Sequence, residues 1–345
     1  MSGKIFHQHL LRRLNQGFAL DPEPVLKHAE GSASWLLDLP NDTDRLPPNP
    51  EKLSWWLMEP KFFFSALWKE LEPPSIFPPG NEHAHWAPIK LTLFATRFRT
   101  FSADIDTVTK LVNTCREHHT TLTGLTQALA PVSLTCALDS QKGFASRTPY
   151  DLRHILPSNP PNYRWLQPKD TMCNYVSVVD HEYDSQLVAS IRTKMPTQTK
   201  NASLPPGVVD IVWSVAARVG GKIKARLNSG LVDDWIGIMK FVSDWRAQQQ
   251  GESDKTRYLS WLVTNLGVLD RDIGQPPGQA GGWSARRAEL VLSAEVPSAA
   301  ISISMVTVKD EQICVTCSWQ DCVVDAELGA RVLGDLERWL NQIIS

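Results

Sequence analysis

Apolar residues recur every three to four positions over several long segments of this chain, which is the spacing of amphipathic helices. The first such segment covers residues 4–19, where Phe6, Leu10, Leu14 and Phe18 would share one face. Further helices are predicted to cover residues 34–37, to begin at Ser102 and near Thr121, and to cover residues 206–227, 234–248 and 326–344.

Other segments alternate apolar and polar residues, which is the spacing of strands with one buried face. The predicted strands cover residues 89–99, 175–179, 258–265, 288–294, 300–308 and 313–319. Helices and strands follow one another without internal repeats or low-complexity tracts. This order favours an α/β fold in which helices cover an open mixed sheet.

Prolines are dense between residues 40 and 88, and they break long regular elements there. This stretch is predicted to be a crossover between two lobes. Residues 55–68 form its most aromatic part. Two interpretations stay open for them: short helices that pack at the lobe interface, or contact with a membrane interface, which the scarcity of Lys and Arg disfavours.

Composition excludes some classes of protein. The formal net charge of −2 argues against nucleic-acid binding, which needs a basic excess. Six cysteines in 345 residues do not form a disulfide framework, so Cys314 and Cys317 are interpreted as buried thiols. No secretory signal and no membrane-spanning apolar run is seen. A cytoplasmic protein is expected, with peripheral contact to the endoplasmic reticulum membrane left open.

Several segments, taken in order, resemble those of fungal alcohol O-acetyltransferases, which are chloramphenicol-acetyltransferase-like, condensation-type acyltransferases. One departure is Cys173, which stands where these enzymes often have glycine. The similar segments are residues 1–15, 111–125, 149–153, 172–177, 264–267 and 319–340.

The resemblance implies transfer of an acyl group, usually acetyl, from acyl-CoA to a hydroxyl of a small alcohol or fungal secondary metabolite. Acyl-CoA is then a co-substrate, and no bound cofactor is expected. The implied organisation is a remnant of the first lobe in residues 1–39, a crossover in residues 40–88 and a chloramphenicol-acetyltransferase-like second lobe in residues 89–345.

In the resembled family a His-x-x-x-Asp-Gly motif carries the general base, directly before the helix that residues 1–15 resemble. The chain contains no His-x-x-x-Asp sequence, so no catalytic residue is assigned. His181 is expected in a solvent-exposed loop, and His118 and His119 at a helix end. Either the first lobe is truncated here, or the chain is a non-catalytic binding relative.

The resemblance also implies a substrate or CoA channel. Arg153 is the candidate to hold the aspartate of the motif, and the other channel candidates are Asn174, Thr264, Asn265 and Gly267. No metal site is expected, because the loop holding His83 and His85 lacks a third ligand at a known spacing. Residues 222–226 are interpreted as a solvated basic helix face, with contact to CoA phosphates as the alternative.

Overall fold

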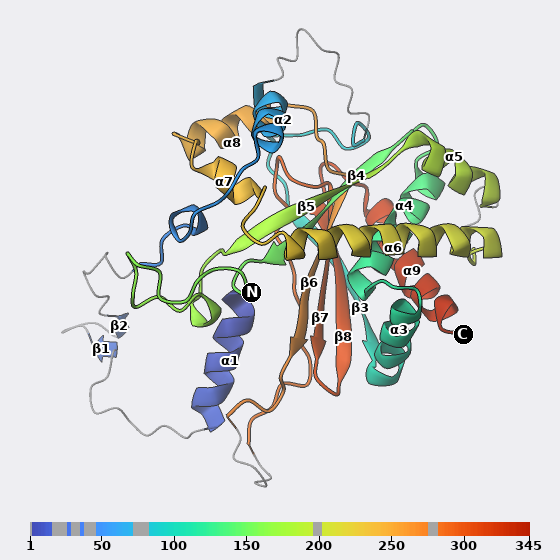
Figure 1. The fold of residues 1–345 in the computed structure, drawn as a ribbon. Coiled ribbons are helices and arrows are strands. Elements are labelled where there is room, and N and C mark those ends of the chain that lie inside the picture. The colour runs from blue at the N-terminus through green and yellow to red at the C-terminus, as the bar shows by residue number, and fades with distance from the viewer. Residues whose placement is uncertain are drawn as a thin grey trace.

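One six-stranded mixed sheet organises the chain (Figure 1). The computed structural model describes residues 2–15, 26–28, 35–37, 46–71, 83–195, 202–274 and 282–345. The strand order is β3-β8-β7-β6-β4-β5, and β1 (Leu26–His28) pairs separately with β2 (Trp35–Leu37). The six strands are β3 (Thr96–Asp104), β4 (Phe144–Asp151), β5 (Val176–Tyr183), β6 (Trp261–Leu269), β7 (Ile301–Val308) and β8 (Gln312–Gln320).

The three central strands β4, β6 and β7 run parallel to one another, and the other neighbours pair antiparallel. The carboxyl ends of these three strands therefore lie at one edge of the sheet. In open α/β sheets, ligands bind outside the carboxyl ends of parallel strands. The loops that follow β4 and β6 are accordingly the first place to look for a site.

Helices cover one face of the sheet, and a further group lies at one end of the molecule (Figure 1). The covering helices are α3 (Ile105–Glu117), α4 (Leu122–Ala137), α5 (Ser185–Lys194), α6 (Pro206–Asn228) and α9 (Ala326–Ile343). The remaining helices are α1 (Ser2–Asn15), α2 (Pro60–Leu71), α7 (Trp235–Met239), α8 (Trp245–Ser253) and the short 3-10 turns at Pro50–Lys52 and Pro168–Asp170.

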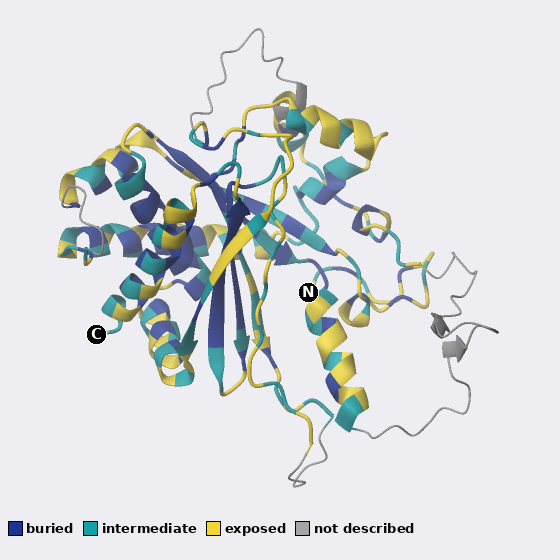
Figure 2. Cartoon of the chain, turned by 180° about the vertical axis from the view of Figure 1, so that it is seen from behind, coloured by how far each residue is buried: buried dark blue, intermediate teal, exposed yellow. Residues whose placement is uncertain are grey.

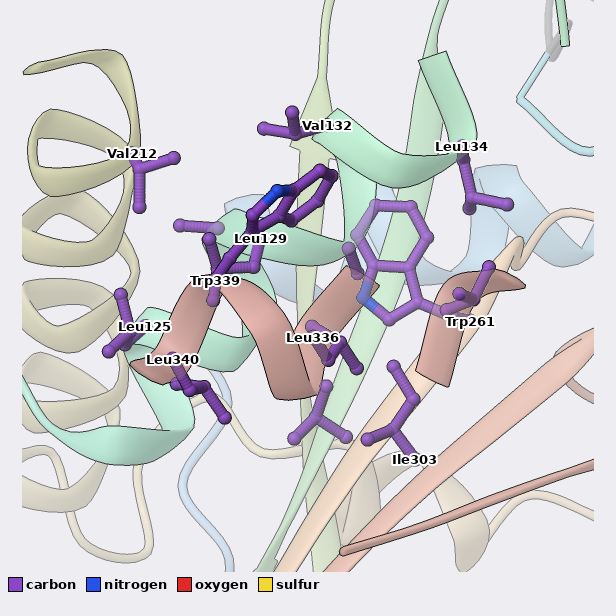
Figure 3. Close-up of a cluster of buried hydrophobic side chains, with 14 of the residues drawn as sticks. Leu125, Leu129, Val132, Leu134, Val212, Trp261, Ile303, Leu336, Trp339 and Leu340 are labelled. Carbon is purple, nitrogen blue, oxygen red and sulfur yellow. The ribbon is translucent and has the colours of Figure 1, made fainter. Parts of the chain in front are cut away.

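The main core lies between the sheet and α4, α6 and α9 (Figure 3). Trp261 of β6 and Trp339 of α9 are among its largest fully buried side chains. Figure 2 shows long runs of buried residues in the middle of the sheet, and β7 and β8 are buried over nearly their whole length. Helix α4 passes so close to α6 that a Cβ on Gly124 would lie 2.9 Å from the Ala216 oxygen.

A buried amide ties α4 to the strands β4 and β6. Gln127 is fully buried, and its Oε1 accepts hydrogen bonds from Ser146 Oγ and Trp261 Nε1, both at 2.7 Å. Its Nε2 donates to Thr148 Oγ1 at 2.8 Å and to the Arg147 oxygen at 3.1 Å. These bonds fix α4 relative to β4 and β6, the strands that lead to the candidate site.

Most predicted helices are confirmed, with shifted ends. The prediction that Ser102 caps a helix is wrong, because Ser102 lies in β3 and Asp104 caps α3 by accepting a hydrogen bond from Thr107 N. The helix predicted over residues 234–248 is two helices, α7 and α8. The helix predicted over residues 34–37 is wrong, since Trp35–Leu37 is β2.

Two strand predictions also need correction. Residues 89–95 are irregular, and β3 begins only at Thr96. Residues 288–294 are not a strand. They run irregularly over the sheet, where the Leu290 and Leu292 oxygens accept hydrogen bonds from Ser304 and Ser318. The alternation seen in this segment reflects partial burial against the sheet, without pairing in it.

Candidate functional site

Helix α1 lies along the carboxyl edge of the sheet (Figure 1). At its amino end, Ser2 Oγ donates a 2.8 Å hydrogen bond to the Cys173 oxygen, in the loop between β4 and β5. At its carboxyl end, Asn15 Nδ2 donates to the Ile273 oxygen at 2.9 Å and the Trp283 oxygen at 2.8 Å. A helix of this length spans about 21 Å. It therefore bridges the loop that follows β4 and the loop that follows β6.

Arg153 lies immediately after β4, where it organises the loop at the amino end of α1. Its side chain is 3% exposed, and Nη1 forms a 2.7 Å ion pair with Asp151. Nη2 donates to the Cys173 oxygen at 2.6 Å, the same oxygen that binds Ser2. The guanidinium also lies over the Tyr175 ring, 5.5 Å from its centre.

One donor of Arg153 is left over. Its Nε is buried and has no hydrogen-bond partner among the described residues. A buried donor without an acceptor costs roughly 1–3 kcal/mol. Arg153 can therefore donate a hydrogen bond to one further acceptor beside the Asp151 carboxylate.

The loop that Arg153 holds also carries Asn174, which is exposed. Its neighbour Cys173 is half-buried, and burial raises the pKa of the Cys173 thiol. The thiol is thus kept protonated near neutral pH, which does not suit a nucleophile. The structure brings two predicted site residues, Arg153 and Asn174, to one loop.

A second group of predicted residues lies on the carboxyl half of β6. Asn265 Nδ2 donates to Thr123 Oγ1 at 3.2 Å, and Asn265 Oδ1 accepts from Gly267 N at 2.8 Å. The strand bulges between Asn265 and Val268, and Gly267 has φ +70°, a conformation that favours glycine. Thr264 is half-buried and points to the opposite face of β6 from Asn265.

Thr123 is not among the site residues predicted from the sequence. It stands in the first turn of α4, which is capped by Thr121. The three threonines at positions 120, 121 and 123 were the available signal. The described residues show no hydrogen bond between the Arg153 group and the Asn265 group, which share only the same edge of the sheet.

The histidines occupy other places. The expectation of a solvent loop for His181 is wrong: it lies in β5, is 2% exposed, and its Nε2 is 3.0 Å from Thr148 Oγ1. Burial lowers the pKa of His181 to about 4. His118 caps the end of α3, as expected, and stacks on Trp213 with ring centres 3.9 Å apart. His154 follows Arg153 and is exposed, and the sequence pattern did not single it out.

The structure also shows where the basic residues of α6 lie and tests two further kinds of site, a metal centre and a membrane span. Arg226 does not belong to a solvated face, because it donates to the Asp233 and Gly230 oxygens, whereas Lys222 and Lys224 are exposed. Among the described residues no group of three potential ligands could hold a metal ion. In the same residues, no helix combines the length and apolar character needed to cross a bilayer.

Comparison with known proteins supports the resemblance. No protein-family model matches the chain. It is 25% identical over 339 residues to the probable alcohol acetyltransferase FCK4 of Fusarium pseudograminearum, covering 97% of this chain and 63% of the relative. It is 32% identical over 133 residues to the probable alcohol acetyltransferase crmB of Aspergillus fumigatus, covering 37% of this chain and 28% of that protein.

A solved structure shares the fold. The trichothecene 15-O-acetyltransferase TRI3 of Fusarium sporotrichioides superposes with a TM-score of 0.64 at 14% identity, covering 99% of this chain and 63% of that one. The similarity to fungal alcohol acetyltransferases and the chloramphenicol-acetyltransferase-like fold are thereby confirmed. The chain spans about 63% of the length of the Fusarium pseudograminearum relative.

Proposed function

We propose that this chain takes part in acyl transfer from acyl-CoA, with acetyl-CoA as the first candidate donor, to the hydroxyl of a small alcohol or fungal secondary metabolite. The observation that carries the proposal is the similarity to a probable alcohol acetyltransferase over 339 residues. The shared fold with an O-acetyltransferase supports it. The loops at the carboxyl edge of the sheet are the proposed substrate channel.

Each candidate residue has a role in this proposal. Arg153 is a positioning residue: it fixes the loop at the amino end of α1, and its Nε–H, which has no partner among the described residues, can donate a hydrogen bond to a further carboxylate there. Asn174 lines the channel, whereas Thr264 points to the opposite face of β6 from Asn265 and supports the strand from behind. Asn265, held by Thr123 and by the turn at Gly267, presents an amide to the acyl-CoA chain.

The chemistry requires a base and an oxyanion donor. An alcohol has a high pKa, so a positioned base must take its proton as the oxygen attacks the thioester carbonyl. The carbonyl oxygen gains negative charge and needs hydrogen-bond donors, while the CoA thiolate leaves and is protonated. In the resembled family the base stands at the amino end of the helix that α1 matches, which is the end that Arg153 organises.

The proposed organisation follows the same lines. Residues 1–39 belong to the first lobe, residues 40–88 cross between lobes, and residues 89–345 form the second lobe. Supporting this, every strand of the six-stranded sheet comes from residues after 89, while α1 only docks at its edge. A cytoplasmic location is part of the proposal, and the six free cysteines suit a reducing compartment.

The test of the proposal measures binding and turnover separately. The purified 345-residue chain is titrated with CoA by calorimetry, and CoA release from acetyl-CoA is followed with a series of alcohols. Asn265→Ala is expected to weaken CoA binding about fivefold, the effect of one hydrogen bond. The matched control Asn228→Ala, exposed at the end of α6, is expected to leave it unchanged. Absence of CoA binding would reject the channel.

Arg153→Lys tests the positioning role. Lysine keeps the charge but cannot form the forked contact with Asp151 and Cys173. Any turnover is expected to fall about 100-fold, the cost of a misplaced reacting group, while CoA affinity stays within about twofold. Equal turnover in Arg153→Lys and the parent chain would contradict this role.

Peripheral membrane contact is the last part of the proposal, with the endoplasmic reticulum as the candidate membrane. The supporting feature is an exposed aromatic surface on α2 and the turns around α7 and α8, where Trp55 is 78% exposed. Lys240 Nζ lies 5.4 Å from the Trp55 ring centre, and the Phe63 and Phe241 rings are 5.4 Å apart. The exposed members are Trp55, Phe64, Trp68, Phe241 and Trp245.

Tryptophan and phenylalanine beside cationic side chains suit the water–lipid interface. The test is flotation with phosphatidylcholine vesicles, with and without phosphatidylserine. Trp55→Ser with Phe64→Ser is expected to abolish flotation. Trp165→Ser, which removes an exposed tryptophan from another surface, should not. If the parent chain does not float with either vesicle, membrane contact is excluded.

A further inference from the structure

A cavity of about 190 Å³ lies where α3 and α9 diverge above the ends of β3, β7 and β8. Its floor is apolar and comes from six elements of the core. The buried floor residues are Phe101, Leu111, Leu122, Met305, Ile313, Val315 and Leu340. Its rim includes the acidic side chains Asp104 and Glu337. The cavity thus combines an apolar floor in the helix–sheet interface with a polar, open mouth.

The volume fits a definite size of ligand. An apolar cavity of about 150 Å³ stays dry and binds benzene. A hollow of 190 Å³ with a floor of Leu, Met and Phe therefore has space for a benzene ring and a short linker. Water gains few hydrogen bonds from such a floor, so an apolar group is favoured over solvent there.

The rim determines the charge of the ligand. The described residues that line the cavity include two carboxylates and no Lys, Arg or His. Asp104 Oδ1 accepts a hydrogen bond from Thr107 N, and the Asp104 carboxylate, which is exposed, also interacts with the Thr107 side chain. Lys110, on the same helix, offsets part of the charge at Asp104, whereas Glu337 is exposed at the mouth. The mouth therefore favours a small cation.

We infer that this cavity binds a small primary amine whose apolar part is about the size of benzene, with the ammonium group between Asp104 and Glu337. The site differs from the proposed acyl-transfer channel. It lies next to it, because Met305 pairs across the sheet with Asn265, and Leu122 precedes Thr123 at the start of α4. A bound amine thus contacts the residues directly behind Asn265.

The test uses the methyl resonance of Met305, which is fully buried on the cavity floor. The chain is labelled with carbon-13 methyl methionine and titrated with 2-phenylethylamine. The Met305 signal, assigned with Met305→Leu, is expected to shift saturably with a Kd of about 1 mM, typical of a fragment-sized ligand. The signal of Met172, 54% exposed in another loop, serves as the internal control and should not move.

Charge variants test the recognition at the mouth. Asp104→Asn with Glu337→Gln is expected to weaken amine binding about threefold or more, the effect of exposed charge pairs. Asparagine still caps α3, so the fold is preserved. The neutral analogue 2-phenylacetamide should bind the parent chain and this variant equally. The matched control is Asp106→Asn with Glu117→Gln, two exposed acids of α3 that do not line the cavity.

The inference is overturned if Met305 shows no saturable shift, or if Met172 shifts in parallel. It is also overturned if the amide binds as tightly as the amine. Should the charge variant fold poorly, Asn341→Trp replaces it, because this exposed residue stands at the mouth and a tryptophan would close it. Unchanged amine binding in Asn341→Trp counts against the site. These readouts do not depend on acyl transfer.

Discussion

Replacement of Gln127 by leucine should destabilise the protein more than any loss of volume can explain. The two side chains are similar in size, so the change mainly removes five hydrogen bonds, the longest of them from Tyr183 OH to Gln127 Oε1 at 3.3 Å. Two partners keep other contacts: Ser146 Oγ lies 3.2 Å from Tyr183 OH, and Thr148 Oγ1 lies 3.0 Å from His181 Nε2.

Trp261 bears the main cost. Its Nε1 donates only to Gln127 among the described residues, and the side chain is fully buried. An orphaned buried donor costs roughly 1–3 kcal/mol, and the partly compensated bonds add about 1 kcal/mol. We therefore expect Gln127→Leu to lower the free energy of unfolding by about 3 kcal/mol. The control Gln186→Leu, exposed on α5, should change it by less than about 0.5 kcal/mol.

The assay is urea unfolding followed by near-ultraviolet circular dichroism, with the midpoint expected to fall at a constant slope. Trp261→Phe removes the orphaned donor, so the double variant should be more stable than the sum of the single effects by about 1–2 kcal/mol. Strict additivity, or a Gln127→Leu variant as stable as the Gln186→Leu control, would refute the explanation.

Three further changes in stability are expected, each measured by urea unfolding. Gly124→Ala should destabilise the chain by about 2 kcal/mol or more, because the new Cβ would lie 2.4 Å from Thr120 Oγ1. Gly221→Ala, which places its Cβ in open space on α6, should stabilise the chain by about 0.5–1 kcal/mol. If Gly124→Ala were the more stable variant, close packing of α4 against α6 would be excluded. Burial lowers the pKa of His181 to about 4 in the folded chain, below the value of about 6.5 expected in the unfolded chain. Between these two pH values the unfolded chain binds a proton on His181 that the folded chain does not bind. The free energy of unfolding should therefore fall by about 3 kcal/mol as the pH drops from 6.5 to 4. His181→Gln should remove that part of the slope, and parallel pH profiles would contradict it. Tyr150→Phe should cost about 1–2 kcal/mol, since the hydroxyl donates to a buried carboxylate of Asp234, and an unchanged midpoint would mean that this bond adds nothing.

Local periodicity predicted the elements that bury one clear face. The helices near residues 122, 206 and 326 and the strands near 301 and 313 appear close to where alternation placed them. Strand β4 (Phe144–Asp151) was missed because it holds Arg147 and Pro149 and shows little alternation. Segment 288–294 alternates without pairing. Pairing partners are set by tertiary contacts, which a local pattern does not contain.

The candidate site was predictable only in part. The resemblance located Arg153, and the structure shows why an arginine is needed: one side chain holds Asp151 and the Cys173 oxygen together. The contact between Asn265 and Thr123 could not be predicted, because 142 positions separate them. The burial of His181 was also unpredictable, since the neighbouring residues Asp180 and Glu182 suggest an exposed loop.

Helix α1 gives the clearest link between the sequence pattern and the proposed organisation. At about 100° per residue, Phe6 and Leu10 lie close together on one side of this helix, and Ile5 and Leu11 lie about 120° apart, centred on the opposite side. The structure buries Ile5 and Leu11 and leaves Phe6 and Leu10 about half exposed. A helix that closed only one lobe would need only one apolar side. Two apolar sides suit a helix that packs between two lobes, so under the proposed organisation Phe6 and Leu10 are expected to face the first lobe, and Phe6→Ser with Leu10→Ser should leave the stability of this chain nearly unchanged.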